Sequence, residues 1–143
     1  MEEQQPKQPG SAASAPEPQK GRILGIGGIF FKSRDPKALG EWYAKHLGMA
    51  IEEWGGVRFD DDAGRPGYTV WCPFSADTDY FAPSAHPYMI NFRVDDLDGM
   101  LAQLREAGVT VDERVEDSEF GRFGWVMDPE GTRIELWQPP AQA

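Results

Sequence analysis

An internal repeat constrains the fold of this chain more than any other feature. Residues 28–49, GIFFKSRDPKALGEWYAKHLGM, and residues 89–109, MINFRVDDLDGMLAQLREAGV, each contain a short apolar run, an aspartate, an amphipathic stretch and a glycine. Asp35 and Asp96 are equivalent, at an offset of 61 residues. Because aspartate favours the N-cap of a helix and glycine the left-handed position after it, each copy predicts a strand followed by a helix.

Further strand patterns follow each predicted helix. The segments are residues 49–54, 57–61 and 68–74 in the first half, and residues 109–113, 123–127 and 133–139 in the second. The last two flank Asp128-Pro129-Glu130-Gly131, which has the residue preferences of a type I turn. Each half therefore predicts a βαβββ module. We expect an α+β fold in which two such modules form a shared cleft.

The ends of the chain differ in composition from its middle. Residues 1–20 hold four of the 12 prolines and no large apolar residue except Met1, which predicts a disordered tail. We expect a single domain over residues 21–139, followed by a short tail over residues 140–143. Within this domain we place module 1 at about 21–74, a linker at about 75–87 and module 2 at about 88–139.

Charge and composition exclude several classes of protein. The chain has 14 Lys and Arg against 24 Asp and Glu, a net charge of −10, which argues against nucleic-acid binding. The single cysteine, Cys72, excludes an internal disulfide and a cysteine-rich zinc site. No apolar run approaches the roughly 20 residues that cross a bilayer, and no secretory signal is recognisable. We expect a soluble, cytoplasmic domain with no membrane partner.

Strand alternation sorts the strand residues between two faces of each predicted sheet. Ile29, Phe31, Ile90, Phe92, Val94, Ile134 and Leu136 are assigned to the helix side. The predicted cleft face then carries a glutamate, Glu135, and a set of ligand-binding candidates: Phe30, Lys32, Thr69, Trp71, Met89, Asn91, Arg93, Trp125 and Trp137. Aromatic walls around a few polar groups are typical of small-molecule sites.

These segments also resemble a known superfamily. The paired modules, INFRVDDLD and above all FGRFGWVMDPEGTRIELWQP resemble the vicinal oxygen chelate superfamily, which includes glyoxalase I, bleomycin-resistance proteins and extradiol dioxygenases. The resemblance covers about residues 22–139. It implies the glyoxalase/bleomycin resistance/dioxygenase fold, and it implies homodimers as an expectation.

The resemblance also implies where a divalent metal would bind. The equivalent ligand places are Gly28, Thr69, Met89 and Glu135, of which only Glu135 matches the family. Glycine offers no side-chain ligand, and a thioether suits hard or borderline ions poorly. We therefore predict no metal ligand set and no cofactor, and we expect His86, in the linker, to be a solvated turn residue.

Two functions follow from this reading. The first is a metal-independent protein of the glyoxalase/bleomycin-resistance type that binds a small organic molecule in the aromatic cleft. The alternative is a lyase, isomerase or dioxygenase-like enzyme that uses Glu135 as a general base or as one of a non-standard set of metal ligands. Glu135 could equally be paired with Arg93 or Lys32, and the residues leave both possibilities open. A third possibility is an accessory domain in a larger assembly, with a cleft filled by side chains.

Overall fold

The computed structural model describes residues 21, 29–60, 64–65 and 67–141. The chain divides into two compact units. The smaller unit consists of Met1–Phe31 and Tyr68–Tyr80, and the larger unit of Lys32–Gly67 and Phe81–Ala143. The predicted tail at residues 1–20, Gly28 and residues 142–143 lie outside the described residues. No helix in the described ranges is long and apolar enough to cross a membrane.

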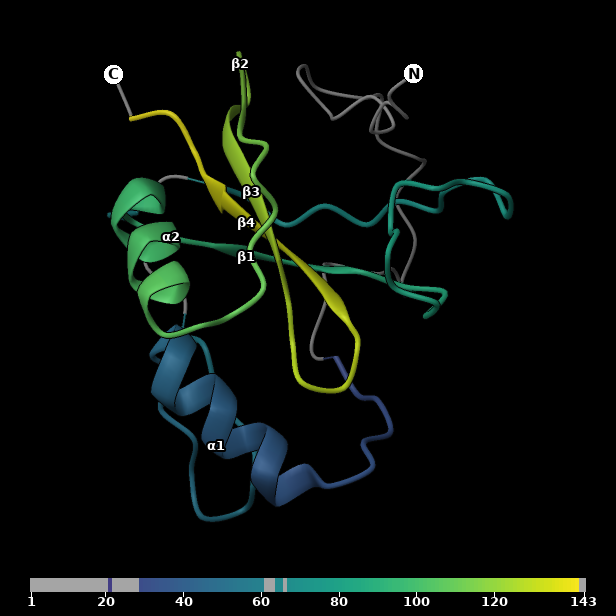
Figure 1. Ribbon diagram of the computed structural model, residues 1–143, viewed down its shortest axis with the longest axis vertical. Coiled ribbons are helices and arrows are strands. Elements are labelled where there is room, and N and C mark those ends of the chain that lie inside the picture. The colour runs from purple at the N-terminus through teal and green to yellow at the C-terminus, as the bar shows by residue number, and fades with distance from the viewer. Residues whose placement is uncertain (1–20, 22–28, 61–63, 66, 142–143) are drawn as a thin grey trace. The chain divides into compact units, whose positions relative to one another are not determined.

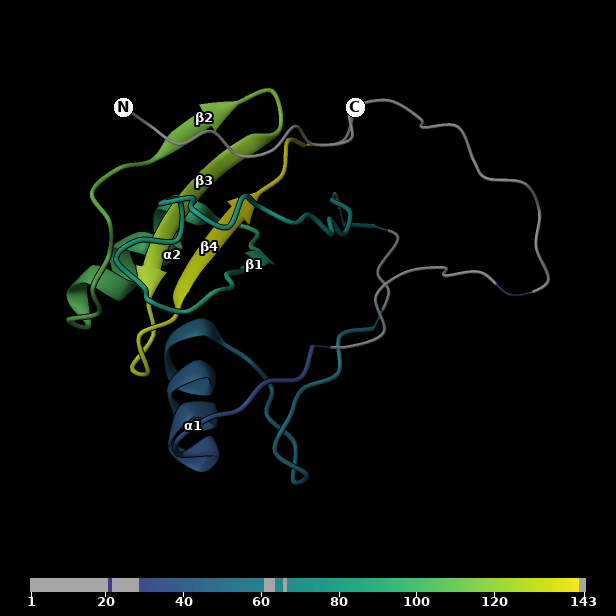
Figure 2. The same ribbon diagram turned by 90° about the vertical axis from the view of Figure 1, so that its right-hand side faces the viewer.

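The larger unit contains a four-stranded sheet with the strand order β1-β4-β3-β2 (Figures 1 and 2). The strands are β1 (Ile90–Arg93), β2 (Glu116–Ser118), β3 (Gly121–Met127) and β4 (Arg133–Gln138). β1 pairs with β4 in parallel, and the other neighbours are antiparallel. Together with two helices this makes the predicted α+β fold, and the second half of the chain forms the predicted βαβββ module except for the place of its second strand.

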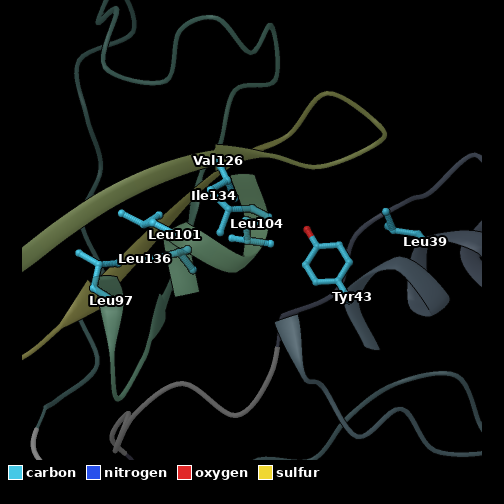
Figure 3. Packing of buried hydrophobic residues seen from close by; sticks show 8 residues of the cluster. All are labelled: Leu39, Tyr43, Leu97, Leu101, Leu104, Val126, Ile134 and Leu136. Atoms are coloured by element: carbon cyan, nitrogen blue, oxygen red, sulfur yellow. The ribbon is translucent and has the colours of Figure 1, made fainter. Parts of the chain in front are cut away.

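Helix α2 (Leu97–Glu106) covers one face of this sheet. Asp96 begins the helix by accepting a hydrogen bond from the backbone of Gly99 at 3.1 Å, as an N-cap does. Leucines at helical spacing then face the sheet. Figure 3 shows Leu97, Leu101 and Leu104 beside Val126, Ile134 and Leu136, all at most 2% exposed. This cluster is the apolar core, and it lies on the face to which alternation had assigned Ile134 and Leu136.

Helix α1 (Pro36–Leu47) joins the same core through Leu39 and Tyr43. Asp35 is its N-cap, and Pro36 occupies the first turn, where its missing N–H costs nothing. Gly48 ends the helix with a left-handed φ of 72°, as predicted. The local sequence signals therefore define both ends of α1.

The predicted strands of the first half do not form among the described residues. Residues 29–32, 49–54, 57–60 and 68–74 carry no strand there. In the 49–54 segment the reason is a tight turn, in which Glu52 donates to the Gly56 carbonyl at 2.8 Å and Gly55 adopts a φ of 97°. Elsewhere the alternating pattern assigns faces, but a strand also requires a hydrogen-bonded neighbour, which a local pattern does not supply.

The predicted strand at residues 109–113 is also wrong in its position. In this segment a single residue pair, Val111 and Val126, forms a β-bridge to β3. The Asp112 side chain then accepts the backbone N–H of Arg114 at 2.9 Å and turns the chain away. The next strand, β2, begins only at Glu116.

Candidate functional site

The face of the sheet opposite α2 holds the predicted glutamate in a fixed position. Register places Asn91, Glu135 and Trp125 side by side on β1, β4 and β3, so the face assignment of these three is confirmed. Asn91 Nδ2 donates to Glu135 Oε1 at 2.8 Å, and Trp125 Nε1 donates to Oε2 at 3.0 Å. Glu135 is 3% exposed and Trp125 fully buried. Each carboxylate oxygen therefore accepts a hydrogen bond from a neutral donor.

Two arginines lie over the ring of Trp125. The guanidinium carbon of Arg114 is 4.8 Å from the ring centre, and that of Arg133 is 5.2 Å from it. Arg133 also contacts Asp112 Oδ2 at 3.4 Å, and Arg114 contacts Glu116 at 3.5 Å. Cations over an indole ring are attracted by its electron-rich face. The indole N–H of Trp125 thus contacts the buried carboxylate, and its ring face contacts two positively charged side chains.

The next row of this face is aromatic. Phe123 and Trp137 stack with their centres 6.0 Å apart and an interplanar angle of 9°. Trp137 Nε1 donates to the Phe120 carbonyl at 2.7 Å. Arg93 is the register partner of Trp137, and its side chain packs so closely against Gly67 that a Cβ at residue 67 would clash with it. Glycine at residue 67, with a φ of 120°, makes this close approach possible.

The remaining predicted ligand-binding residues are spread over both units. Lys32 and Met89 belong to the larger unit, where Met89 is half-buried and Lys32 exposed. Phe30, Thr69 and Trp71 belong to the smaller unit, in segments without regular secondary structure. The structure therefore brings together Asn91, Trp125 and Glu135, with Arg93 and Trp137 in the adjacent row. A role in binding for the other residues stays a prediction.

The residues near Glu135 do not fit the divalent metal implied by the superfamily. Both oxygens of Glu135 are engaged by side-chain donors, and Met89 offers only a thioether. Among the described residues no group of three or more His, Cys, Asp or Glu is placed to hold a metal ion. His86 is half-buried and not solvated as expected, because its Nδ1 lies 2.9 Å from Thr132 Oγ1 and its ring stacks on Tyr88.

The Asp128–Gly131 turn has a structural role that the sequence reading missed. Asp128 Oδ1 accepts the backbone N–H groups of Glu130 and Thr132, and Asp128 Oδ2 accepts the hydroxyl of Tyr43 on α1 at 2.8 Å. Burial, with this hydrogen bond to Asp128, raises the pKa of Tyr43 well above its usual value of 10.0. The buried aspartate thus joins the β3–β4 turn to the first helix.

Glu130 makes a second connection, to the start of α1. Its carboxylate accepts hydrogen bonds from the Ser33 hydroxyl at 2.8 Å, the Arg34 N–H at 3.1 Å and the Asp35 N–H at 3.2 Å. These bonds, led by that of Ser33, lower the pKa of Glu130 below its usual 4.5. Acidic residues are common in turns, so the motif alone did not reveal this contact. The exposed N–H groups before a predicted helix were the available signal.

A shallow pocket of about 250 Å³ lies beside the same turn. Trp42 and His46 of α1 line one side of it, and Gly108, Thr110 and Asp128 are among the residues on the other. None of the residues that line it is a predicted ligand-binding residue. It does not include Asn91, Trp125 or Glu135, although Met127 of β3 lines it.

Comparisons with known proteins identify the family. A family model described as a glyoxalase-like domain matches residues 28–137. No curated protein matches the chain. A glyoxylase/bleomycin resistance protein/dioxygenase domain from Frankia sp. EAN1pec is 14% identical over 83% of this chain and 100% of its own, with a TM-score of 0.51.

Two further solved structures are more similar in sequence. TnmS3, an antibiotic-binding protein from Streptomyces sp. CB03234, is 30% identical over 76% of this chain and 88% of its own, with a TM-score of 0.44. Glyoxalase I of Leishmania major is 32% identical over 35% of this chain, with a TM-score of 0.29. The chain spans 34% of the length of that enzyme and 47% of another relative, a conserved domain protein. The family match over residues 28–137 shows that this chain belongs to the glyoxalase-like domain family of the vicinal oxygen chelate superfamily.

Proposed function

We propose that this chain binds a small organic molecule on the sheet face opposite α2, and that it does so without the divalent metal of its superfamily. The observation that carries the proposal is the state of Glu135. Its carboxylate is buried and each of its oxygens accepts a hydrogen bond, from Asn91 and from Trp125. A carboxylate held in this way fixes the positions of the Asn91 and Trp125 side chains on this face of the sheet.

The side chains around Glu135 support this proposal. Indole and phenyl rings line the face, and a small number of polar groups converge there, as in most small-molecule sites. The relative TnmS3 is an antibiotic-binding protein, so antibiotics belong among the compounds to be tested. A cytoplasmic location, a homodimer and contacts of the ligand with Phe30, Lys32, Thr69, Trp71, Met89, Asn91, Arg93, Trp125 and Trp137 stay predictions.

Binding can be tested by titrating the full chain with a panel of small organic compounds and following tryptophan fluorescence. We expect saturable quenching by at least one compound, and a loss of affinity in Trp125→Phe, which removes the N–H that Glu135 accepts. Trp54→Phe is the matched control because Trp54 is 69% exposed. A panel without any saturable ligand would contradict the proposal.

The metal-free part of the proposal has a test of its own. Elemental analysis of the purified chain, with thermal shifts in zinc, nickel, manganese and iron, is expected to show no stoichiometric ion and no stabilisation. Tight binding of one of these ions, lost in Glu135→Gln, would support the metal-dependent enzyme instead. Turnover of a substrate that Glu135→Gln abolishes without a change in fold would support Glu135 as a general base.

A further inference from the structure

Three segments of the larger unit line the shallow pocket beside the β3–β4 turn. Trp42 and His46 come from α1, residues 107–110 follow α2, and residues 127–129 lie at the end of β3. The volume of about 250 Å³ exceeds the roughly 150 Å³ of a cavity that holds benzene and is below the roughly 300–1,000 Å³ of sites for drug-sized ligands. The pocket therefore has the size of a compound with one or two rings.

The α1 side of the pocket is aromatic. The Trp42 and His46 rings lie 5.1 Å apart at an interplanar angle of 49°, and both residues are half-buried. In the described part of the chain the ring nitrogens of His46 have no hydrogen-bond partner, and neither has the hydroxyl of Thr110, which lines the other side. The pocket thus combines flat ring faces with polar groups that are available to a ligand.

The charges around the pocket favour a neutral ligand. Asp128 is the one carboxylate among the described residues that line it, and none of these residues is Lys or Arg. An anionic ligand would therefore meet a negative charge without a cation in the lining to compensate it. Outside the lining, Arg34 donates to the Pro129 carbonyl at 3.4 Å, so a positive charge already lies beside the pocket and would repel a second one.

We propose that this pocket is a second binding site, which takes a neutral planar heteroaromatic compound with an N–H and a C=O group on one edge. The ring of the compound packs on Trp42, beside Val109 and Met127. A neutral imidazole offers one donor and one acceptor, and a hydroxyl both donates and accepts. An edge with an N–H and a C=O therefore finds a partner in His46 or Thr110, whichever imidazole nitrogen carries the proton.

The test uses isoquinolin-1-one, a neutral bicyclic lactam, and its N-methyl derivative, which lacks the N–H. Each is titrated into the full isotope-labelled chain, and the indole N–H signals are followed by NMR, with that of Trp42 assigned through Trp42→Phe. We expect the lactam to shift the Trp42 signal saturably and to bind about fivefold more tightly than the N-methyl derivative, as one hydrogen bond provides. His46→Phe keeps a ring and removes both nitrogens, so it should reduce this preference.

Trp54→Phe is the matched control, because Trp54 is an exposed tryptophan that does not line the pocket. This variant should bind both probes as the wild type does. Thr110→Val replaces a hydroxyl at an exposed position; it should also reduce the preference, and it carries the test if His46→Phe fails to fold.

Three results overturn this inference: no saturable shift of the Trp42 signal, equal affinities of the wild type for the two probes, or a preference that neither His46→Phe nor Thr110→Val reduces. The proposed function is judged separately, by the compound panel and by Trp125→Phe, because Trp125 does not line this pocket. Either proposal can therefore fail without the other.

Discussion

The two helices of the larger unit are attached to the sheet in different ways. α2 is held mainly by apolar burial, through three leucines that are at most 2% exposed, beside an exposed Asp98–Arg122 ion pair and a hydrogen bond from the Leu97 N–H to Gln138. α1 contributes Leu39 and Tyr43 to the core, but it is also connected through the Asp128–Gly131 turn by hydrogen bonds to Tyr43, Ser33, Arg34 and Asp35. Apolar burial is insensitive to pH, whereas these polar contacts contain two groups with shifted pKa values. The attachment of α1 should therefore respond to pH, and that of α2 should not.

The largest effect is expected from truncating the α2 contact. Leu101→Ala should lower the free energy of unfolding by about 2–5 kcal/mol, because it leaves a cavity against Gly124 and the sheet. The measurement is chemical denaturation at neutral pH. Ala102→Gly, at an exposed site of the same helix, should cost about 1 kcal/mol. An equal loss in both variants would contradict burial as the main attachment of α2.

Asp128→Ala should have the next largest effect. It removes one carboxylate that accepts three hydrogen bonds, so we expect a loss of about 2–3 kcal/mol in the free energy of unfolding. Asp98→Ala is the comparison, because its pair with Arg122 is exposed and worth about 0–1 kcal/mol. If the two variants were equally stable, the turn would not be an anchor for α1.

Tyr43→Phe isolates the hydroxyl in this connection. We expect a loss of about 1–2 kcal/mol at pH 7. Because the folded state raises the pKa of Tyr43, neutral tyrosine stabilises the fold below the unfolded pKa of 10.0, and this contribution falls as pH rises above it. Wild-type stability should therefore decline more steeply than that of the variant above about pH 10. Parallel pH profiles in this range would remove Tyr43 from the explanation.

Glu130→Gln should give the smallest change in the free energy of unfolding, and this change should depend on pH in the acidic range. The folded state lowers the pKa of Glu130, so its contribution is present above the unfolded value of 4.5 and is lost as pH falls below it. Wild type should be more stable than the variant at pH 7, and the difference should shrink towards pH 3. Glu41→Gln, on the exposed side of α1, serves as the control and should show no such convergence.

The two halves of the chain show how far the sequence reading extended. In the second half, helical periodicity located α2, and alternation assigned Ile134 and Leu136 to the core and Asn91, Trp125 and Glu135 to the opposite face. In the first half, only α1 matched its prediction among the described residues. Helices form bonds within one segment, whereas strands need a partner that is distant in sequence.

The candidate site likewise has a part that was predictable from the sequence and a part that was not. Its composition on β1, β3 and β4 was predictable, because the period of two places Asn91, Trp125 and Glu135 on one face. The contributions of Arg114 and Asp112 were not, because Asp112 lies in a segment that was predicted as a strand and forms none, and Arg114 lies in the irregular segment before β2. The position of a loop residue depends on the path of the backbone, which a local sequence period does not predict.

By itself, the sequence determined the two helices with their caps, the strands β1, β3 and β4, and which of their side chains face α2. These features depend on local hydrogen bonding and on the periods of helix and strand. Only the tertiary structure decided that Glu135 is bonded by Asn91 and Trp125, that two arginines cover the indole, and that Asp128 and Glu130 connect to α1. Such contacts join residues on different strands, turns and helices, and their distances are set when the core packs.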